Sequence, residues 1–361
     1  MAKLRLLGID LIRSIAAYAV VLLHADEGIS QPPDGWATIL KLSGFAVPFF
    51  LAASFYLSTA KLHAAVSPYR IKPRLSRLLI PYGFWTVMYI LYKVAKYSVD
   101  NEPERITALL SDPIPLIFFG SAAFHLYFLP LLSVGTVLLK PIEKLLQKTS
   151  NINILTVFFI LSTLIYELIL ASGNSFQSAE GVAFQSLIGS VFPGANGNPI
   201  IRVGLVALYA VCRCLPYIFL ALILSHPRIP GMFQKRTKFY AWVWLLLFLG
   251  VVLLGQGILP KSIYELASGY LALLLAIALS AHLHPSAILT SLGQCSFGIY
   301  LTHLFVVDIF YILSSRLFPQ LIAQPSVVVL LSIATLVYLI SWGATILFLK
   351  HKPVSRLMFG V

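Results

Sequence analysis

The chain has 361 residues, of which 59% are hydrophobic and only 11% are charged. Together with a mean hydropathy of +0.89, this composition excludes an ordinary soluble domain and favours a bundle of membrane-spanning helices. The formal net charge is +13, but the basic residues cluster in short segments between apolar runs. Membrane topology therefore explains them better than nucleic-acid binding does.

Apolar runs of about membrane length follow one another along the whole chain. We predict an all-α integral membrane protein, a polytopic bundle of about ten transmembrane helices in which residues 1–361 form a single domain. The predicted spans are residues 9–25, 38–58, 78–97, 122–139, 152–171, 203–224, 239–259, 264–281, 296–314 and 326–349. The start of the fourth span is blurred, because residues 114–123 are also apolar.

The distribution of Lys and Arg predicts the orientation of these helices. If the chain starts inside, most of them fall in cytoplasmic segments, so we expect both termini in the cytoplasm. We expect a multi-pass protein of the plasma (inner) membrane. Arg13 interrupts the first apolar run and no clear cleavage site follows, which indicates an uncleaved first helix. The longest outer connection, residues 172–202, is either a mobile connector or carries a short helix over the outer mouth.

Arg13 and His24 lie on one face of the first predicted span. They are eleven residues apart, which separates their side chains by about 20° around a helix and about 16 Å along it. Because a basic group inside hydrocarbon costs about 2.5 kcal/mol or more, such residues are candidates for function. Arg13 either snorkels to the inner headgroups or anchors an anionic ligand, and Asp10, one turn earlier, can pair with it.

His24 falls near the outer end of the same span. It is either an interfacial histidine with satisfied hydrogen bonds or a general base that works near neutral pH. Asp26 and Glu27 follow it, but positions i+2 and i+3 at a fraying helix end need not face the ring. The sequence therefore leaves open which group orients His24.

Arg74 and Arg77 share a helical face at the inner end of the third predicted span. A positive-inside patch explains them without further function, whereas planar guanidinium groups also suit phosphate recognition. His125 is expected near the outer surface, within an aromatic segment. An aromatic belt explains Phe124 and Tyr127 but not His125, so both a belt and a site remain open there.

A later stripe holds Ser296, Tyr300 and His303, which are spaced i, i+4 and i+7 along the ninth predicted span. Gly298 lies between them and allows another helix to approach closely. The stripe is either a packing surface of the bundle or part of a site.

No metal site is expected in this chain. Its three cysteines show neither a CxxC spacing nor a neighbouring histidine cluster: Cys212, Cys214 and Cys295. Buried apolar packing is the ordinary role of such cysteines, so a disulfide framework is not expected either.

These motifs together resemble the membrane acyltransferase-3 family. Arg13 and His24 match the family's pattern of a basic residue, ten residues and a histidine, and Asp10 fits an acidic position three residues before the arginine. Arg74 and Arg77 match its Arg-x-x-Arg pattern before the third helix.

Two further segments are similar to family motifs. Residues 124–129, FHLYFL, resemble FHLWYL, with Tyr127 and Phe128 where Trp and Tyr are usual. Residues 296–303, SFGIYLTH, resemble the family's late S-x-G-I-Y-L-x-H pattern. Each motif alone is weak, but four of them in the family's order among predicted membrane spans are specific.

The resemblance implies transfer of an acyl group, usually acetyl from acetyl-CoA, to a hydroxyl of an envelope carbohydrate or related acceptor. Acyl-CoA is then a donor substrate, and no cofactor is bound. The expected partners are acyl-CoA, a carbohydrate or lipid-linked acceptor and the lipid bilayer. The identity of the acceptor and of the acyl group stays open.

The resemblance also implies roles for single residues. The donor phosphates are assigned to three arginines at the inner face: Arg13, Arg74 and Arg77. His24 deprotonates the acceptor hydroxyl or transiently carries the acyl group itself. His125 and Tyr300 hold or polarise the thioester carbonyl or the acceptor. Three residues have supporting roles: Asp10, Ser296 and His303.

Two other classes of function fit part of the pattern. A transporter or flippase also needs buried Arg and His residues, but the chain shows no inverted repeat and no paired broken segments. A membrane sensor or scaffold would use the polar residues only to hold helices together.

Overall fold

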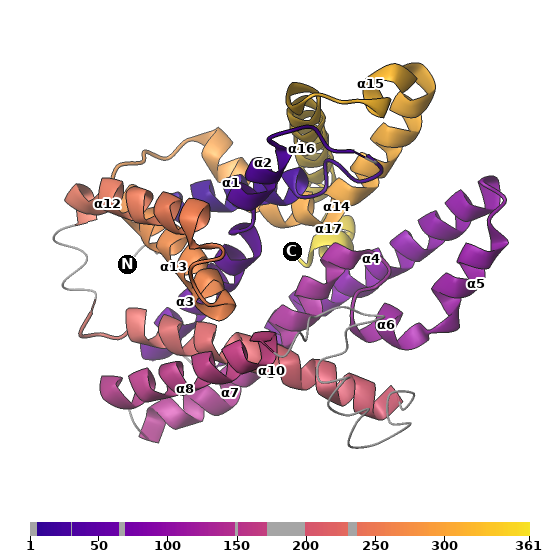
Figure 1. The fold of residues 1–361 in the computed structure, drawn as a ribbon. Coiled ribbons are helices and arrows are strands. Elements are labelled where there is room, and N and C mark those ends of the chain that lie inside the picture. The colour runs from indigo at the N-terminus through magenta and orange to yellow at the C-terminus, as the bar shows by residue number, and fades with distance from the viewer. Residues whose placement is uncertain (1–5, 30, 65–68, 149–150, 172–198, 230–236) are drawn as a thin grey trace. The chain divides into compact units, whose positions relative to one another are not determined.

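The computed structural model describes residues 6–29, 31–64, 69–148, 151–171, 199–229 and 237–361. Within these ranges the chain is helical and has no β-strand, which confirms the predicted all-α class (Figure 1). The chain forms two compact units: unit 1 is Met1–Ser54 with Arg228–Val354, and unit 2 is Phe55–Pro227 with Ser355–Val361. Most of the predicted outer connection, residues 172–202, lies outside the described residues.

Unit 1 is built around the first helix of the chain. Its elements are α1 (Leu7–Leu22), α2 (Trp36–Ser43), the start of α3 (Ala46–His63), α12 (Thr237–Gly250), the π-helical turn η3 (Val251–Gly255), α13 (Lys261–Leu279), α14 (Ala287–Leu317), α15 (Pro319–Ala323), α16 (Val327–Leu349) and the start of α17 (Lys352–Phe359). Helix α1 packs against α13, α14 and α16, and α14 also packs against α16 (Figure 1). Their shared core contains Val21, Ile299 and Val337, all buried.

Polar contacts fix the register of α1, α14 and α16. The Tyr18 hydroxyl lies 2.9 Å from the Thr335 hydroxyl, and the Tyr338 hydroxyl donates to the backbone carbonyl of Ser14 at 3.4 Å. Gly298 faces Thr345, and a Cβ on this glycine would lie 2.3 Å from the Thr345 Cγ2 atom. The predicted close helix approach at Gly298 is therefore confirmed.

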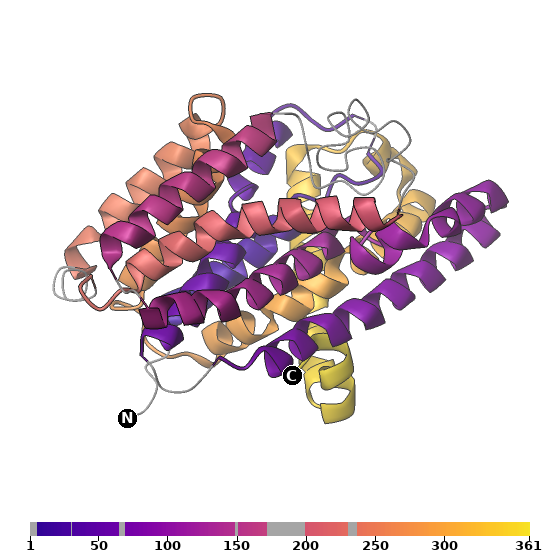
Figure 2. The same ribbon diagram turned by 90° about the horizontal axis from the view of Figure 1, so that it is seen from below.

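Unit 2 contains the segment between the two parts of unit 1 together with the last residues of the chain. Its elements are the end of α3, α4 (Ile71–Val99), α5 (Pro103–Ser111), α6 (Pro113–Phe118), the 3₁₀ turn η1 (Phe124–Tyr127), α7 (Phe128–Lys148), α8 (Ile152–Ala171), α10 (Pro199–Leu224) and the end of α17. Helix α7 packs against both α4 and α10, and the long helix α10 also packs against α8 (Figure 2). This arrangement positions Arg74 and Arg77 on α4 and His125 just before α7.

Within the described residues, eight helices are long and apolar enough to cross a membrane, and each overlaps one of the predicted spans. The other two predicted spans, 9–25 and 239–259, correspond to α1, which has 16 residues, and to the shorter apolar helix Tyr240–Gly255. The number of ten spans therefore stays a prediction. Large apolar side chains such as Leu168, at 71% exposure, and Trp242, at 74%, face outward, as lipid contact requires.

Candidate active site

His24 lies just beyond the end of α1, in the turn formed by residues 23–28. The backbone N–H of His24 donates to the carbonyl of Val21 at 3.1 Å, and the N–H of Glu27 donates to the carbonyl of His24 at 3.3 Å. Gly28 then takes φ = +89°, a left-handed conformation that suits glycine and ends the turn. The side chain of His24 is buried, with 8% of the residue exposed.

The imidazole of His24 is hydrogen-bonded to an acid three residues later. Its Nδ1 atom lies 2.9 Å from Oε1 of Glu27. A carboxylate can only accept, so Nδ1 carries the hydrogen and Nε2 carries the lone pair. His24 is thereby held in the tautomer that a general base or nucleophile requires.

A second imidazole faces His24 from α14. The rings of His24 and His303 are 5.2 Å apart between centroids, with a tilt of 33°. Nδ1 of His303 lies 2.7 Å from the backbone carbonyl of Tyr300, which can only accept a hydrogen bond. Nδ1 of His303 therefore carries the hydrogen, as Nδ1 of His24 does, and His303 is fully buried.

The predicted stripe on α14 is confirmed as a buried face. Ser296, Tyr300 and His303 are all buried on one continuous helix, and the rings of Tyr300 and His303 lie 6.2 Å apart. The Ser296 hydroxyl donates to the carbonyl of Gly293 at 2.9 Å on its own helix. In unit 1 the His303 ring therefore lies between the rings of His24, at 5.2 Å, and Tyr300, at 6.2 Å.

Arg13 and Asp10 lie on α1, about three and about four helical turns before His24. Arg13 is half-buried and Asp10 is buried, with 7% of the residue exposed. The Asp10 side chain packs against Gly293, since a Cβ on that glycine would lie 2.5 Å from the Asp10 Cβ. The contact between α1 and α14 therefore places His24 beside His303 and, farther along the two helices, Asp10 beside Gly293.

Arg74 is held in a defined position at the start of α4 in unit 2. Its guanidinium donates to the Ser58 hydroxyl at 2.9 Å and lies over the Tyr69 ring, 4.3 Å from the centroid. The backbone N–H of Tyr69 donates to Glu143 on α7 at 2.7 Å, which fixes the ring. Burial raises the pKa of the Tyr69 phenol, and the nearby Arg74 cation opposes this shift.

Arg77 is exposed, and its backbone is covered by the end of the chain. Gly360 has φ = +71°, and a Cβ there would lie 2.4 Å from the carbonyl oxygen of Arg77. The indole N–H of Trp85 donates to the carbonyl of Met358 at 2.9 Å, so a second contact holds this segment on α4. The C-terminal residues thus support the part of α4 that carries the two arginines.

We expect Gly360→Ala to destabilise this support by about 1 kcal/mol or more, because alanine is strained at positive φ and its Cβ meets the Arg77 backbone. The melting temperature of the detergent-solubilised protein should fall, as measured by size-exclusion chromatography after heating. Gly204→Ala on α10 is the matched control, since a Cβ there meets nothing within 4 Å. Equal melting temperatures for the two variants would contradict the assignment.

His125 lies in the turn η1, after Gly120 has reversed the chain with φ = +74°. It is buried, with 3% of the residue exposed, and its ring lies 5.4 Å from that of Tyr89 on α4. The preceding Phe124 is 54% exposed, so the aromatic-belt interpretation fits Phe124 while His125 points into unit 2. His125 is therefore built into unit 2, whereas His24 belongs to unit 1.

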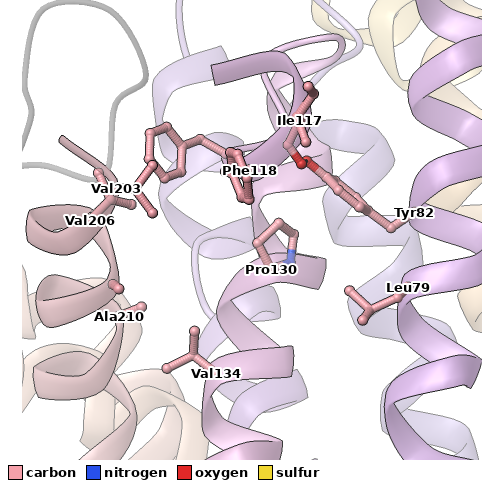
Figure 3. Close-up of a pocket in the computed structure, with 11 residues that line it drawn as sticks. Leu79, Tyr82, Ile117, Phe118, Pro130, Val134, Val203, Val206 and Ala210 are labelled. Carbon is pink, nitrogen blue, oxygen red and sulfur yellow. The ribbon is translucent and has the colours of Figure 1, made fainter. Parts of the chain in front are cut away.

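Unit 2 also contains an apolar cavity of about 220 Å³ among α4, α6, α7 and α10 (Figure 3). Tyr82, Phe118 and Val203 line it, and the Tyr82 hydroxyl is engaged with the backbone, donating to Ile117 at 2.9 Å and accepting from Gly120 at 3.0 Å. A cavity of about 150 Å³ accommodates benzene. This cavity therefore suits an apolar group and not a charged nucleotide.

The sequence did not single out Glu27 as the partner of His24, although an acid at i+3 was visible there. The described residues contain no cluster of three His, Cys, Asp or Glu side chains that could hold a metal ion. Unit 1 holds two imidazoles with defined tautomers, His24 and His303. Such groups accept protons or attack acyl carbons.

Comparison with known proteins agrees with these motifs. A family model described as an acyltransferase domain matches residues 6–346, a range that contains all the predicted site residues. No curated protein and no solved structure gives a significant match. Because the family match covers nearly the whole chain, this protein belongs to the acyltransferase-3 family and is a multi-pass membrane acyltransferase.

Proposed function

We propose that the protein transfers an acyl group, most simply acetyl, from cytoplasmic acyl-CoA to a hydroxyl of an envelope carbohydrate or lipid-linked acceptor. The observation that carries the proposal is the pair of buried imidazoles, His24 and His303, at the end of the helix that also holds Arg13. A family of acyltransferases needs a base or nucleophile for the acceptor, and His24 has the defined tautomer for it.

The donor side of the proposal rests on arginines. CoA carries phosphates, and planar guanidinium groups bind phosphate through paired hydrogen bonds. Arg74 is oriented by Ser58 and Tyr69, and Arg77 follows one turn later on α4. Arg13 precedes His24 by about 16 Å of helical rise, a length comparable with the pantetheine arm that joins the phosphates to the thioester.

The transfer can follow a direct or a covalent route. In the direct form, Nε2 of His24 takes the acceptor proton, the acceptor oxygen attacks the thioester carbon, the C–S bond breaks, and the imidazolium returns the proton to the leaving CoA thiolate. In the covalent form, Nε2 attacks the thioester carbon, the C–S bond breaks and the CoA thiolate leaves, which gives an acyl-imidazolium. The acceptor hydroxyl then attacks the acyl carbon, the C–Nε2 bond breaks, and the acceptor proton goes to the CoA thiolate. Tyr300 and His125 are proposed to hold the carbonyl or the acceptor, and Ser296, His303 and Asp10 to support the site.

The proposal includes an orientation. The distribution of basic residues favours both termini in the cytoplasm of a plasma-membrane protein, which puts Arg74 and Arg77 on the side where acyl-CoA is made. His24 then lies toward the opposite face. Donor and acceptor can meet without either one crossing the membrane.

Mass spectrometry of envelope glycans from cells with and without this protein tests the proposed function. We expect a glycan that carries an added acyl mass, 42 Da for acetyl, only when the protein is present. A transporter would instead change the amount or location of a glycan without changing its mass. No acyl difference in any envelope fraction would overturn the proposal.

A further inference from the structure

We propose that Glu27 is the positioning residue of His24: its carboxylate fixes the imidazole tautomer and stabilises the imidazolium that forms during transfer. The inference rests on the proposed function, because it assigns Glu27 a role in the same reaction. It also answers the question that the sequence leaves open, namely which group orients His24.

The first support is the geometry of the contact. Nδ1 of His24 and Oε1 of Glu27 are 2.9 Å apart, within the range of a direct charge-assisted hydrogen bond. The Glu27 side chain is 35% exposed while the His24 side chain is 10% exposed. The carboxylate thus keeps contact with solvent while its hydrogen bond reaches the buried ring.

The second support is that the backbone holds Glu27 in place. The turn after α1 bonds the N–H of Glu27 to the carbonyl of His24, and the Tyr311 hydroxyl on α14 donates to the carbonyl of Ala25 between them. Gly28 ends the turn directly after Glu27. The acid is therefore preorganised by α14 and by the turn, as a residue that positions a catalytic group needs to be.

The third support is the tautomer of the His24 ring, which lies between Glu27 and His303. His303 packs on His24 with its own Nδ1 committed to the Tyr300 carbonyl. If His24 adopted the opposite tautomer, its Nδ1 lone pair would face the Glu27 carboxylate, which is repulsive. The acid thus selects Nε2 as the reactive atom, as the third group does in other nucleophile–base arrangements.

Asp26 is the competing acid, and it serves as the matched control. Asp26 lies two residues after His24 in the chain, but the hydrogen bond to Nδ1 is made by Glu27. Asp26→Asn removes one negative charge beside the site without removing that bond. Glu27→Gln removes the charge while leaving an oxygen that can accept from Nδ1, and Glu27→Ala removes both.

The test uses inverted membrane vesicles that contain the full chain and receive acetyl-CoA radiolabelled in the acetyl group. Hydroxylamine-labile label on the vesicles is followed as acetyl-CoA is varied, at equal protein abundance. We expect the maximal rate to fall about 10- to 1000-fold in Glu27→Gln and further in Glu27→Ala. The apparent KM for acetyl-CoA should stay within about twofold. Asp26→Asn should retain its rate, because the carboxylate that is hydrogen-bonded to the imidazole, and so stabilises its charge during transfer, is that of Glu27.

The possible results distinguish failure of the proposed acyl transfer from failure of the role of Glu27. Absence of transfer by the wild-type protein would overturn the proposed function and the role of Glu27 with it. Wild-type rates in both Glu27 variants would overturn the role of Glu27 alone. An Asp26→Asn loss equal to that of Glu27→Gln would also overturn it, since any negative charge near the site, and not the carboxylate bonded to the imidazole, would then matter.

Discussion

Replacing His24 with alanine or glutamine is expected to lower acyl transfer about 100- to 10,000-fold, the range that a lost general base or nucleophile causes. The reason is that His24 presents its Nε2 lone pair from a buried position, with Nδ1 held by Glu27. The measurement is the amount of acylated envelope glycan, by mass spectrometry, at matched levels of protein in the membrane.

His284→Ala is the matched control for that experiment. His284 is exposed in the connection between α13 and α14 and makes no part of the proposed site. We expect it to acylate at the wild-type level. If His24→Ala acylates as well as His284→Ala does, then His24 has no part in the transfer.

Reversing the charges of Arg74 and Arg77 to glutamate is expected to weaken donor binding. Each charge-assisted hydrogen bond to phosphate contributes about 1.5–3 kcal/mol, so the loss should raise the apparent KM for acetyl-CoA by at least about tenfold. The measurement is the rate of transfer at increasing acetyl-CoA concentrations in inverted vesicles. Arg77→Glu alone should show the same direction without disturbing the contacts of Arg74 with Ser58 and Tyr69.

Lys72→Glu controls for the general positive charge of this segment. Lys72 is exposed on the same helix as Arg74, and its reversal changes the local charge by the same amount as one arginine reversal. We expect it to have a smaller effect on the KM. An unchanged dependence on acetyl-CoA in the arginine variants, with normal protein levels, would contradict the phosphate role.

Hydropathy predicted the bounds of a helix correctly where the apolar run and the helix begin and end at the same residues. Helix α8 has the predicted bounds, 152 and 171, because most of its residues are apolar from one end to the other. Helix α14 begins at Ala287 and not at 296, since Ser286 caps it by accepting from the N–H of Leu289 at 3.1 Å and its first turns carry polar residues. Hydropathy alone could not find this start.

Breaks inside apolar runs were also beyond the sequence pattern. The predicted span 38–58 is divided between α2 and α3 near Gly44, and residues 114–123 form the short helix α6 followed by a reversal at Gly120. At both positions the helix is interrupted although the sequence stays apolar, so hydropathy shows a single run. Only the backbone geometry reveals them.

The candidate site was predictable in part. The spacing of Ser296, Tyr300 and His303 predicted one buried face, because helical periodicity alone determines it. The contact between His24 and His303 was not predictable, because it depends on how α1 packs on α14. Glu27 was missed because its hydrogen bond depends on the turn beyond the helix end, where periodicity no longer applies.

The most direct measurement compares the two orientations of sealed membrane vesicles given acetyl-CoA with a radiolabelled acetyl group. Inverted vesicles expose the cytoplasmic face, so we expect hydroxylamine-labile label to accumulate in them, with little in right-side-out vesicles and little in inverted vesicles carrying His24→Gln. Equal labelling of both orientations, or undiminished labelling with His24→Gln, would contradict transfer from a cytoplasmic thioester by this imidazole.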